Sequence, residues 1–118
     1  YGGNPLACAA GLAVAQYMCD HNVLDNVKAR GDQLEAGLKA LAEKYPTVLG
    51  QVRGWGLLRG VECIASDITA GDLVGAAMKE GLLLVPAGPT VVRFVPPLIV
   101  SEEEITMALE RFENAVKA

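Results

Sequence analysis

The chain has 118 residues, of which 52% are hydrophobic and 20% are charged, and its formal net charge at pH 7 is −4. This length and composition are typical of one folded domain with a buried core, and they exclude a disordered segment. Because the net charge is negative and no basic patch occurs, the composition argues against nucleic acid or an anionic membrane surface as partner.

The three cysteines, Cys8, Cys19 and Cys63, are odd in number and widely spaced, and His21 is the only histidine. A zinc site requires ligands at closer spacing, so the sequence predicts no metal site. Free thiols are typical of a reducing compartment. We therefore expect a cytoplasmic protein.

The first segment, Tyr1-Gly-Gly-Asn-Pro5, predicts a flexible turn and a helix start, because Asn is a favoured N-cap and Pro is favoured at the first helical position. The helix should run from Pro5 to about Asp20, and its body is apolar on every side. Such a helix is covered all round, and it is too short to span a membrane. Since the chain also starts without Met, we expect it to be cut from a longer protein that covers this helix.

A second, amphipathic helix should be capped by Asn22 and end before Pro46. Its predicted buried stripe consists of Leu24, Val27, Gly31, Leu34, Leu38, Leu41 and Tyr45. Its predicted solvated face holds Lys28, Arg30, Asp32, Glu35 and Lys39.

Two strands, about Val48 to Arg53 and Leu57 to Ile64, should form a hairpin through Gly54-Trp55-Gly56, where glycine permits positive φ. The glycines do not indicate a nucleotide-binding loop, because a strand follows them instead of a helix N-terminus. We interpret Arg53 and Arg59 as structural groups on this hairpin.

A third helix should run from about Ala70 to Glu80 and end at Gly81, with Leu73, Val74, Ala77 and Met78 facing inward. A short strand, Leu82 to Val85, and a second one, Val91 to Val95, follow. The last helix starts at a capping box formed by Ser101 and Glu104, and its inner face consists of Ile105, Ala108, Leu109, Phe112 and Val116. This order predicts an α+β fold, with helices on one face of a small, mainly antiparallel sheet.

The strand Val91 to Val95 carries a single charge, Arg93, and prolines at Pro89 and Pro96-Pro97 limit it at both ends. Alternation places Arg93 on the face opposite Val92 and Phe94. A guanidinium among valines loses hydration unless an anion meets it. Two interpretations remain open: an internal salt bridge or a sheet-edge arginine that reaches solvent, or a carboxylate site matched by the planar donor fork.

No other catalytic set is evident. One histidine cannot supply a Ser-His-Asp set, and Lys28, Lys39, Lys44, Lys79 and Lys117 all lie on predicted solvated helix faces or helix ends. The residues therefore predict one anion site and no catalytic residue within the chain.

Three blocks resemble the C-terminal part of a class III pyridoxal-phosphate aminotransferase. They are Tyr1-Gly-Gly-Asn-Pro-Leu-Ala-Cys-Ala-Ala, Val52-Arg-Gly-Trp-Gly-Leu-Leu-Arg-Gly-Val-Glu62, and Val92-Arg-Phe-Val-Pro-Pro-Leu-Ile-Val-Ser-Glu-Glu-Glu-Ile105. Within this family the chain is most similar to the acetylornithine/succinylornithine group, with ornithine and 4-aminobutyrate aminotransferases near by. The blocks stand in the family's order and cover essentially the whole chain.

The resemblance implies a fold-type I homodimer with active sites at the subunit interface, a pyridoxal 5'-phosphate cofactor, and amino-acid and 2-oxoglutarate substrates in arginine biosynthesis. Residues 1–22 would be a linking helix from the large domain, and residues 23–118 would be the small C-terminal domain. The family's carboxylate-binding arginine maps onto Arg93. Gly2, Gly3 and Asn4 would lie near the phosphate of the partner subunit's cofactor. The Schiff-base lysine would precede Tyr1, so the chain alone should be inactive.

Two other classes of function fit the residues. One is a self-standing α+β regulatory module that binds a carboxylate through Arg93. The other is a purely structural dimerisation domain.

Overall fold

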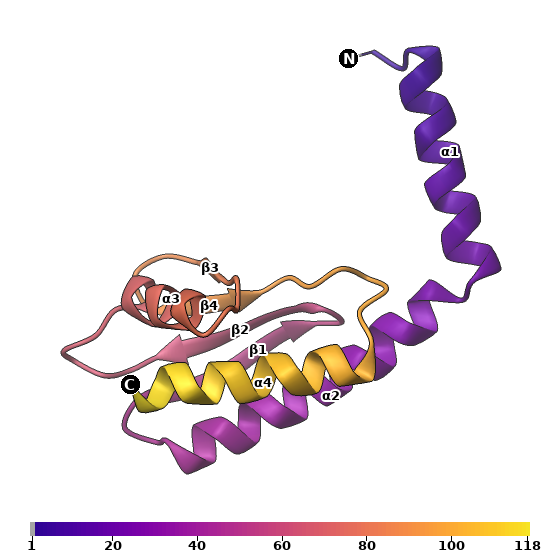
Figure 1. Cartoon of the computed structure of the whole chain (residues 1–118). Coiled ribbons are helices and arrows are strands. Elements are labelled where there is room, and N and C mark those ends of the chain that lie inside the picture. The colour runs from indigo at the N-terminus through magenta and orange to yellow at the C-terminus, as the bar shows by residue number, and fades with distance from the viewer. Residues whose placement is uncertain (1) are drawn as a thin grey trace.

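The structure is a computed structural model that describes residues 2–118. The strands form a four-stranded antiparallel sheet in the order β1-β2-β4-β3. Three helices, α2, α3 and α4, pack with this sheet (Figure 1). The elements are α1 (Pro5–Asp20), α2 (Val23–Lys44), β1 (Leu49–Trp55), β2 (Leu58–Cys63), α3 (Ala70–Lys79), β3 (Val85–Pro86), β4 (Val91–Phe94) and α4 (Glu102–Lys117). The predicted α+β class is confirmed.

One face of the sheet forms the core with α2, α3 and α4. In β4, Val92 and Phe94 are buried, whereas Val91 and Arg93 on the opposite face are only half-buried. The Phe94 ring meets the ring of Phe112 in α4 edge to face, with centroids 5.1 Å apart. The other core residues come from three helices and two further strands, and they include Leu34, Leu38, Leu49, Val61, Leu73, Ile105 and Val116. The predicted arrangement of helices on one face is therefore correct.

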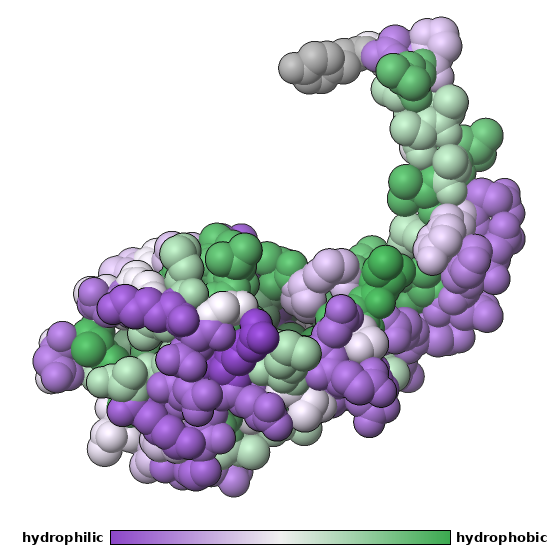
Figure 2. All heavy atoms as spheres, in the orientation of Figure 1, coloured by the Kyte–Doolittle hydropathy of each residue, from purple (hydrophilic) through white to green (hydrophobic). Residues whose placement is uncertain are grey.

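Helix α1 projects away from this domain and contributes no buried residue to it (Figure 1). Asn4 caps it by accepting a hydrogen bond from the Ala7 N–H at 2.9 Å, as the sequence predicts. Figure 2 shows hydrophobic side chains along most of α1, and Leu6 is 81% exposed. The residues described here leave this apolar helix uncovered.

The junction between α1 and α2 differs from the prediction. Asn22 makes no side-chain cap and adopts the left-handed conformation, with φ of 48°, which asparagine tolerates better than most residues. The N–H of Asp25 bonds to the Asn22 carbonyl instead. The sequence predicts Leu24 on the buried stripe of α2, but its side chain is 68% exposed. Val23 is buried instead, because only one side of the first turn of α2 is covered.

The hairpin turn is shorter than predicted and lies later in the chain. Trp55 is the last residue of β1 and pairs with Leu58, so Gly56 and Leu57 make the turn. Gly54 and Gly56 both have positive φ, at 130° and 50°, as predicted for the two glycines.

Arg59 of β2 holds this turn from the core side. It is 5% exposed, and its guanidinium donates to the carbonyls of Gly54 at 2.6 Å and Gly56 at 3.0 Å. It also forms an ion pair with Glu35 of α2 at 2.9 Å. Glu35 was assigned to a solvated face, but it joins the hairpin to the helix, and its hydrogen bond with Lys39 and the charge of Arg59 lower its pKa. The structural role predicted for Arg59 agrees with these contacts.

Helix α3 begins with a capping box of Thr69 and Asp72 that the sequence analysis missed. The helix ends at Lys79, one residue before the predicted Glu80, and Gly81 then takes the predicted left-handed conformation, with φ of 77°. Met78 was predicted to face inward, but it is 58% exposed. The strand predicted at Leu82–Val85 lies later, at Val85–Pro86, because the Leu82 N–H still bonds to a carbonyl of α3.

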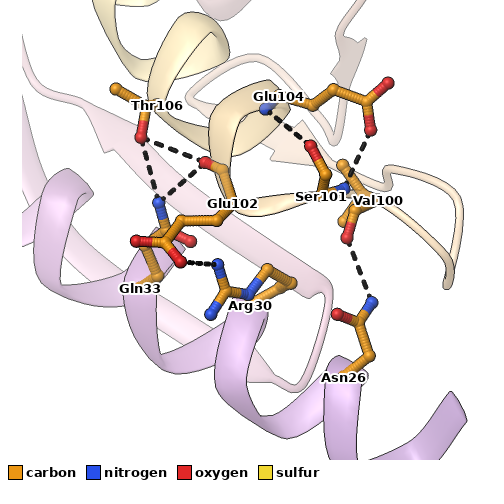
Figure 3. A network of polar contacts seen from close by, with 8 residues as sticks. All are labelled: Asn26, Arg30, Gln33, Val100, Ser101, Glu102, Glu104 and Thr106. Atoms are coloured by element: carbon orange, nitrogen blue, oxygen red, sulfur yellow. Dashed lines mark hydrogen bonds and ion pairs between the residues drawn. The ribbon is translucent and has the colours of Figure 1, made fainter.

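Polar contacts join the start of α4 to α2 (Figure 3). The predicted capping box of Ser101 and Glu104 is present, with both reciprocal bonds. The Gln33 amide donates to the Glu102 carbonyl at 3.0 Å, and Arg30 pairs with the Glu102 carboxylate at 3.1 Å. The N-terminus of α4 is thereby fixed on α2, after the segment of residues 95–101 that follows β4.

At the other end of α4, Glu113 meets α2. Its carboxylate accepts hydrogen bonds from Lys44 and from the Tyr45 hydroxyl, and it also pairs with Lys117. These partners, Lys44 first, lower the pKa of Glu113 to about 2. The same interaction raises the pKa of Lys44.

Substitution of Gly31 by Ala tests the contact between α2 and the hairpin turn. A Cβ at Gly31 would lie 2.5 Å from the carbonyl oxygen of Gly56, so the backbone must move. We expect the free energy of urea unfolding to fall by about 1–3 kcal/mol. The matched control is Gly75→Ala in α3, where a Cβ meets nothing within 4 Å. It should raise that free energy by about 0.5–1 kcal/mol. A gain in stability for Gly31→Ala would contradict the close approach.

The Glu113 cluster predicts a pH dependence of stability. Because the folded-state pKa lies near 2 and the ordinary value is 4.5, the contribution of the carboxylate is complete above pH 4.5 and is lost as pH falls towards 2. Glu113→Gln should therefore be less stable than the parent at pH 7, with a difference that shrinks across this window. Chemical denaturation of both proteins at a series of pH values measures it, and a difference that is constant with pH would refute the interpretation.

Candidate functional site

Arg93 lies at the centre of the open face of the sheet. Strand β4 pairs with β2 on one side, where Arg93 faces Gly60, and with β3 on the other, where it faces Val85. Arg93 is therefore not on an edge strand. Its Nε atom is buried, and it has no hydrogen-bond partner.

The side chain of Arg93 forms no ion pair with any carboxylate of residues 2–118. The nearest acid along β2 on the same face is Glu62, which pairs with Val91 in the sheet register. Its carboxylate leans the other way, so that a Cβ on Gly50 of β1 would come within 3.3 Å of it. The internal salt bridge left open by the sequence is thus absent from the described chain, and so is the sheet-edge alternative.

A second arginine lies in the same row of the sheet. In the strand register, Arg53 of β1 is opposite Gly60 of β2, and Gly60 is opposite Arg93 of β4. Both arginines line a shallow pocket of about 280 Å³ whose floor includes Gly60. The sequence alone does not predict this row. The feature that could have revealed the row is the position of the hairpin turn, because a turn at Gly56–Leu57 sets the strand register that aligns Arg53 with Gly60.

The arginines predicted to be structural differ in their surroundings. Arg59 is among the residues that line this pocket, but its side chain lies on the core face of the sheet, where the guanidinium is engaged by the hairpin carbonyls and by Glu35. Arg53 is exposed and donates only to the side-chain carbonyl of Gln51, at 3.3 Å. The single contact of Arg53 therefore does not support the structural role predicted for it.

Gly2, Gly3 and Asn4 lie at the N-terminal end of α1, far from β4, the strand that carries Arg93 (Figure 1). Gly2 and Gly3 have φ of 57° and 70°, and all three residues are exposed. A Cβ on Gly2 would meet nothing within 4 Å. The first twenty residues hold no Lys or Arg, so this turn offers backbone N–H groups to an anion and no positive charge.

The remaining reactive side chains form no second site in the described part of the chain. Cys8 and Cys19 are exposed, Cys63 is buried, and all three are free. His21 stacks on Tyr17 at the end of α1, with ring centroids 3.9 Å apart. Among residues 2–118, no group of His, Cys, Asp and Glu side chains is suited to hold a metal ion. None of the described helices has the length and hydrophobicity needed to cross a membrane.

A larger pocket of about 390 Å³ lies between the segment around Leu83, the end of β4 and α4. Its lining is almost entirely apolar, and its one acid, Glu104, is already used in the capping box of α4. It provides no group for chemistry.

The family model described as aminotransferase class-III matches residues 1–116. The chain belongs to the class-III aminotransferase family. The resemblance that the three sequence blocks indicated is thereby confirmed.

Curated relatives are similar over nearly the whole chain. The acetylornithine aminotransferase of Nostoc sp. is 59% identical over 118 aligned residues, which cover 98% of this chain and 27% of that protein. That of Synechocystis sp. is 55% identical over 117 residues, with the same coverage. The chain thus spans about a quarter of the length of these relatives.

Solved structures show the same fold. An ornithine aminotransferase from Toxoplasma gondii superimposes with a TM-score of 0.89 at 31% identity, covering 98% of this chain and 28% of that one. An N-acetylornithine aminotransferase from Stenotrophomonas maltophilia gives 0.87 at 33% identity, covering 98% and 32%. The fold predicted from the resemblance is therefore also confirmed.

Proposed function

We propose that this chain is the C-terminal part of a pyridoxal-phosphate aminotransferase that transfers the amino group of N-acetylornithine to 2-oxoglutarate, a step of arginine biosynthesis in the cytoplasm. The two curated relatives described above, at 59% and 55% identity, are both acetylornithine aminotransferases, and this favours the acetylated donor. The observation that carries the proposal is the half-buried guanidinium of Arg93, which has no anionic partner among residues 2–118.

In this proposal Arg93 binds a substrate carboxylate. Its fork can donate two parallel N–H bonds to the two carboxylate oxygens, and partial burial strengthens such charge-assisted bonds. A two-point contact also fixes the rotation of the substrate, which decides the bond to Cα that is presented for cleavage. The open face of the sheet, where Arg93 lies, would then face the active site.

The residues fit the substrate side of such a site better than the cofactor side. When bound, pyridoxal phosphate supplies an aldehyde carbon for the amine and a ring that accepts electrons. Gly2, Gly3 and Asn4 form an exposed turn that can contribute backbone N–H groups beside the phosphate of a partner subunit's cofactor. The lysines of this chain are either paired with glutamates (Lys39, Lys44 and Lys117) or exposed on helices (Lys28 and Lys79), so the attachment lysine must come from outside the chain.

The same proposal accounts for α1. Residues 1–22 would link a large cofactor-binding domain to the small domain of residues 23–118, and the enzyme would be a homodimer with active sites at the subunit interface. The large domain or the partner subunit would cover the apolar side chains of α1 that this chain leaves exposed. A helix that is apolar on every side is normally buried, because burial removes its apolar side chains from water.

Arg93→Lys in the full-length enzyme tests the carboxylate role. Lysine keeps the charge but loses the bidentate fork, so KM for 2-oxoglutarate should rise about tenfold or more, the loss typical of one charge-assisted hydrogen bond. The absorbance of the bound cofactor should stay unchanged. Arg111→Lys is the control, because Arg111 bonds only to the Gly81 carbonyl at the surface. Near-normal kinetics for Arg93→Lys would show that Arg93 does not bind substrate.

The exposed apolar side chains of α1 allow a test of whether this helix is normally covered by another part of the protein. We expect the isolated 118-residue chain to self-associate in size-exclusion chromatography, because its first helix exposes Leu6, Leu12 and Val14. Replacing these three residues by Gln should shift the chain towards monomer. Met78→Gln, on exposed α3, should leave the association unchanged. A monomeric parent chain would instead favour the self-standing carboxylate-binding module.

A further inference from the structure

Two pockets meet at Leu58, near the hairpin turn. One is the pocket of about 280 Å³ that Arg93 lines, and Leu58 is part of its lining. The other pocket, of about 530 Å³, is lined by Leu58, Trp55, Val95 and further residues, none of which is charged. A pocket with an unpaired guanidinium and a pocket without charge are therefore neighbours.

The strand register explains why Leu58 lies beside Arg93. Leu58 precedes Gly60 by two residues in β2, and Gly60 is opposite Arg93 in β4. Arg59, between them, is on the core face, so Leu58 shares the open face with Gly60 and Arg93. Leu58 and Arg93 are thus diagonal neighbours, and such residues lie about 7–8 Å apart. One small ligand can contact both side chains.

The second pocket presents apolar side chains that nothing in residues 2–118 covers. Trp55 is paired with Leu58 across the hairpin, and the two side chains are 91% and 54% exposed. Grouped apolar side chains on a surface are typical of binding sites, and an indole ring offers a large flat contact area. Glu62, the one acid of β2, lies on the other side of Gly60 from Leu58. The apolar pocket therefore offers no carboxylate to a cationic group of a ligand.

We propose that Leu58 and Trp55 are specificity-determining residues, which select a donor that has an uncharged acyl group beside its carboxylate. The inference rests on the proposed function, in which Arg93 binds a substrate carboxylate. In N-acetylornithine the acetyl group is on the amine next to the carboxylate, so its methyl carbon lies about 5 Å from the carboxylate carbon. When the carboxylate is bound to Arg93, the acetyl group can lie against Leu58 and Trp55.

The selection follows from hydration. In ornithine the amine next to the carboxylate is free and charged, and it would lose water against this apolar surface without gaining a partner. In N-acetylornithine the same nitrogen belongs to a neutral amide, and the acetyl methyl group gains apolar contact. One such group in an apolar pocket typically changes specificity by about tenfold or more.

The experiment compares the binding of N-acetylnorvaline and valerate to the full-length protein by isothermal titration calorimetry. The two ligands share a carboxylate and a five-carbon chain, and only the first carries an acetamido group. Neither has an amine that could react with the cofactor aldehyde. The variants are Leu58→Asn and Trp55→Ala. The control is Leu83→Asn, which makes the same change at an exposed leucine outside both pockets. Circular dichroism checks that each variant folds.

We expect the parent protein to bind N-acetylnorvaline at least about fivefold more tightly than valerate. Leu58→Asn and Trp55→Ala should each remove most of this preference and change valerate binding less than about twofold, because valerate has no group in the apolar pocket. Leu83→Asn should keep the preference. A parent protein that binds neither ligand or shows no preference would overturn the proposal. So would an unchanged preference in either variant, or an equal loss of both ligands.

Kinetics separate this inference from the proposed function. In an active enzyme, both variants should lower the ratio of kcat/KM for N-acetylornithine to that for ornithine about fivefold. KM for 2-oxoglutarate, which carries no acyl group on nitrogen, should change less than about twofold. A preference for N-acetylnorvaline without transamination of N-acetylornithine would refute the proposed function and leave this inference standing. Transamination without that preference would do the reverse.

Discussion

The open face of the sheet holds the half-buried guanidinium of Arg93, which has no anionic partner among residues 2–118, and the proposed function depends on this unpaired charge. Removing a charged group from water is costly, and the cost is recovered only when an opposite charge or good acceptors replace the water. At Arg93 the described chain supplies neither to the buried Nε. Strand β4 is paired on both sides, so the backbone at Arg93 is fixed while the charge of its side chain remains unpaired among residues 2–118. Such an arrangement suits a preformed site for an anion that arrives from outside the chain.

Arg59 shows what a structural arginine looks like in the same sheet. It lies on the adjacent strand, with its side chain on the core face, and it donates to the carbonyls of Gly54 and Gly56 while pairing with Glu35. The guanidinium of Arg59 thus joins the hairpin turn to α2 and is fully engaged by these contacts. Arg59 and Arg93 have the same chemistry, and their surroundings differ: the guanidinium of Arg59 is paired, whereas that of Arg93 has no anionic partner among residues 2–118. The open face therefore differs from the core face in charge balance as well as in exposure.

Helix α1 extends the same contrast to the whole molecule. Residues 23–118 bury a core of their own, whereas α1 has apolar side chains and no cover among the described residues. The open face of the sheet also carries exposed apolar groups, among them Leu58 and Val85. Two uncovered surfaces, one apolar and one mixed apolar and cationic, are expected where a domain docks against the rest of a larger protein. The chain belongs to the class-III aminotransferases and covers 27% of its Nostoc sp. relative, which agrees with this.

The sequence by itself determined the features that depend on neighbours in the chain. The capping box at Ser101 and Glu104, the positive φ of Gly54, Gly56 and Gly81, and the alternation around Arg93 were all predicted, because each follows from local backbone chemistry or from strand periodicity. Local rules also explain some errors. Asn22 satisfies the rule for a cap, yet it takes the left-handed conformation that the same residue type permits.

Only the tertiary structure decided which residues far apart in the chain meet. The exposure of Leu24 and Met78 depends on where the covering elements stop, which periodicity does not contain. The pairing of Arg59 with Glu35 and the alignment of Arg53 with Arg93 across Gly60 depend on helix packing and on strand register. A shift of one residue in the turn would move Arg53 to another partner, since register sets every cross-strand neighbour. Arg93 could therefore be named from its strand, whereas the second arginine of its row could not.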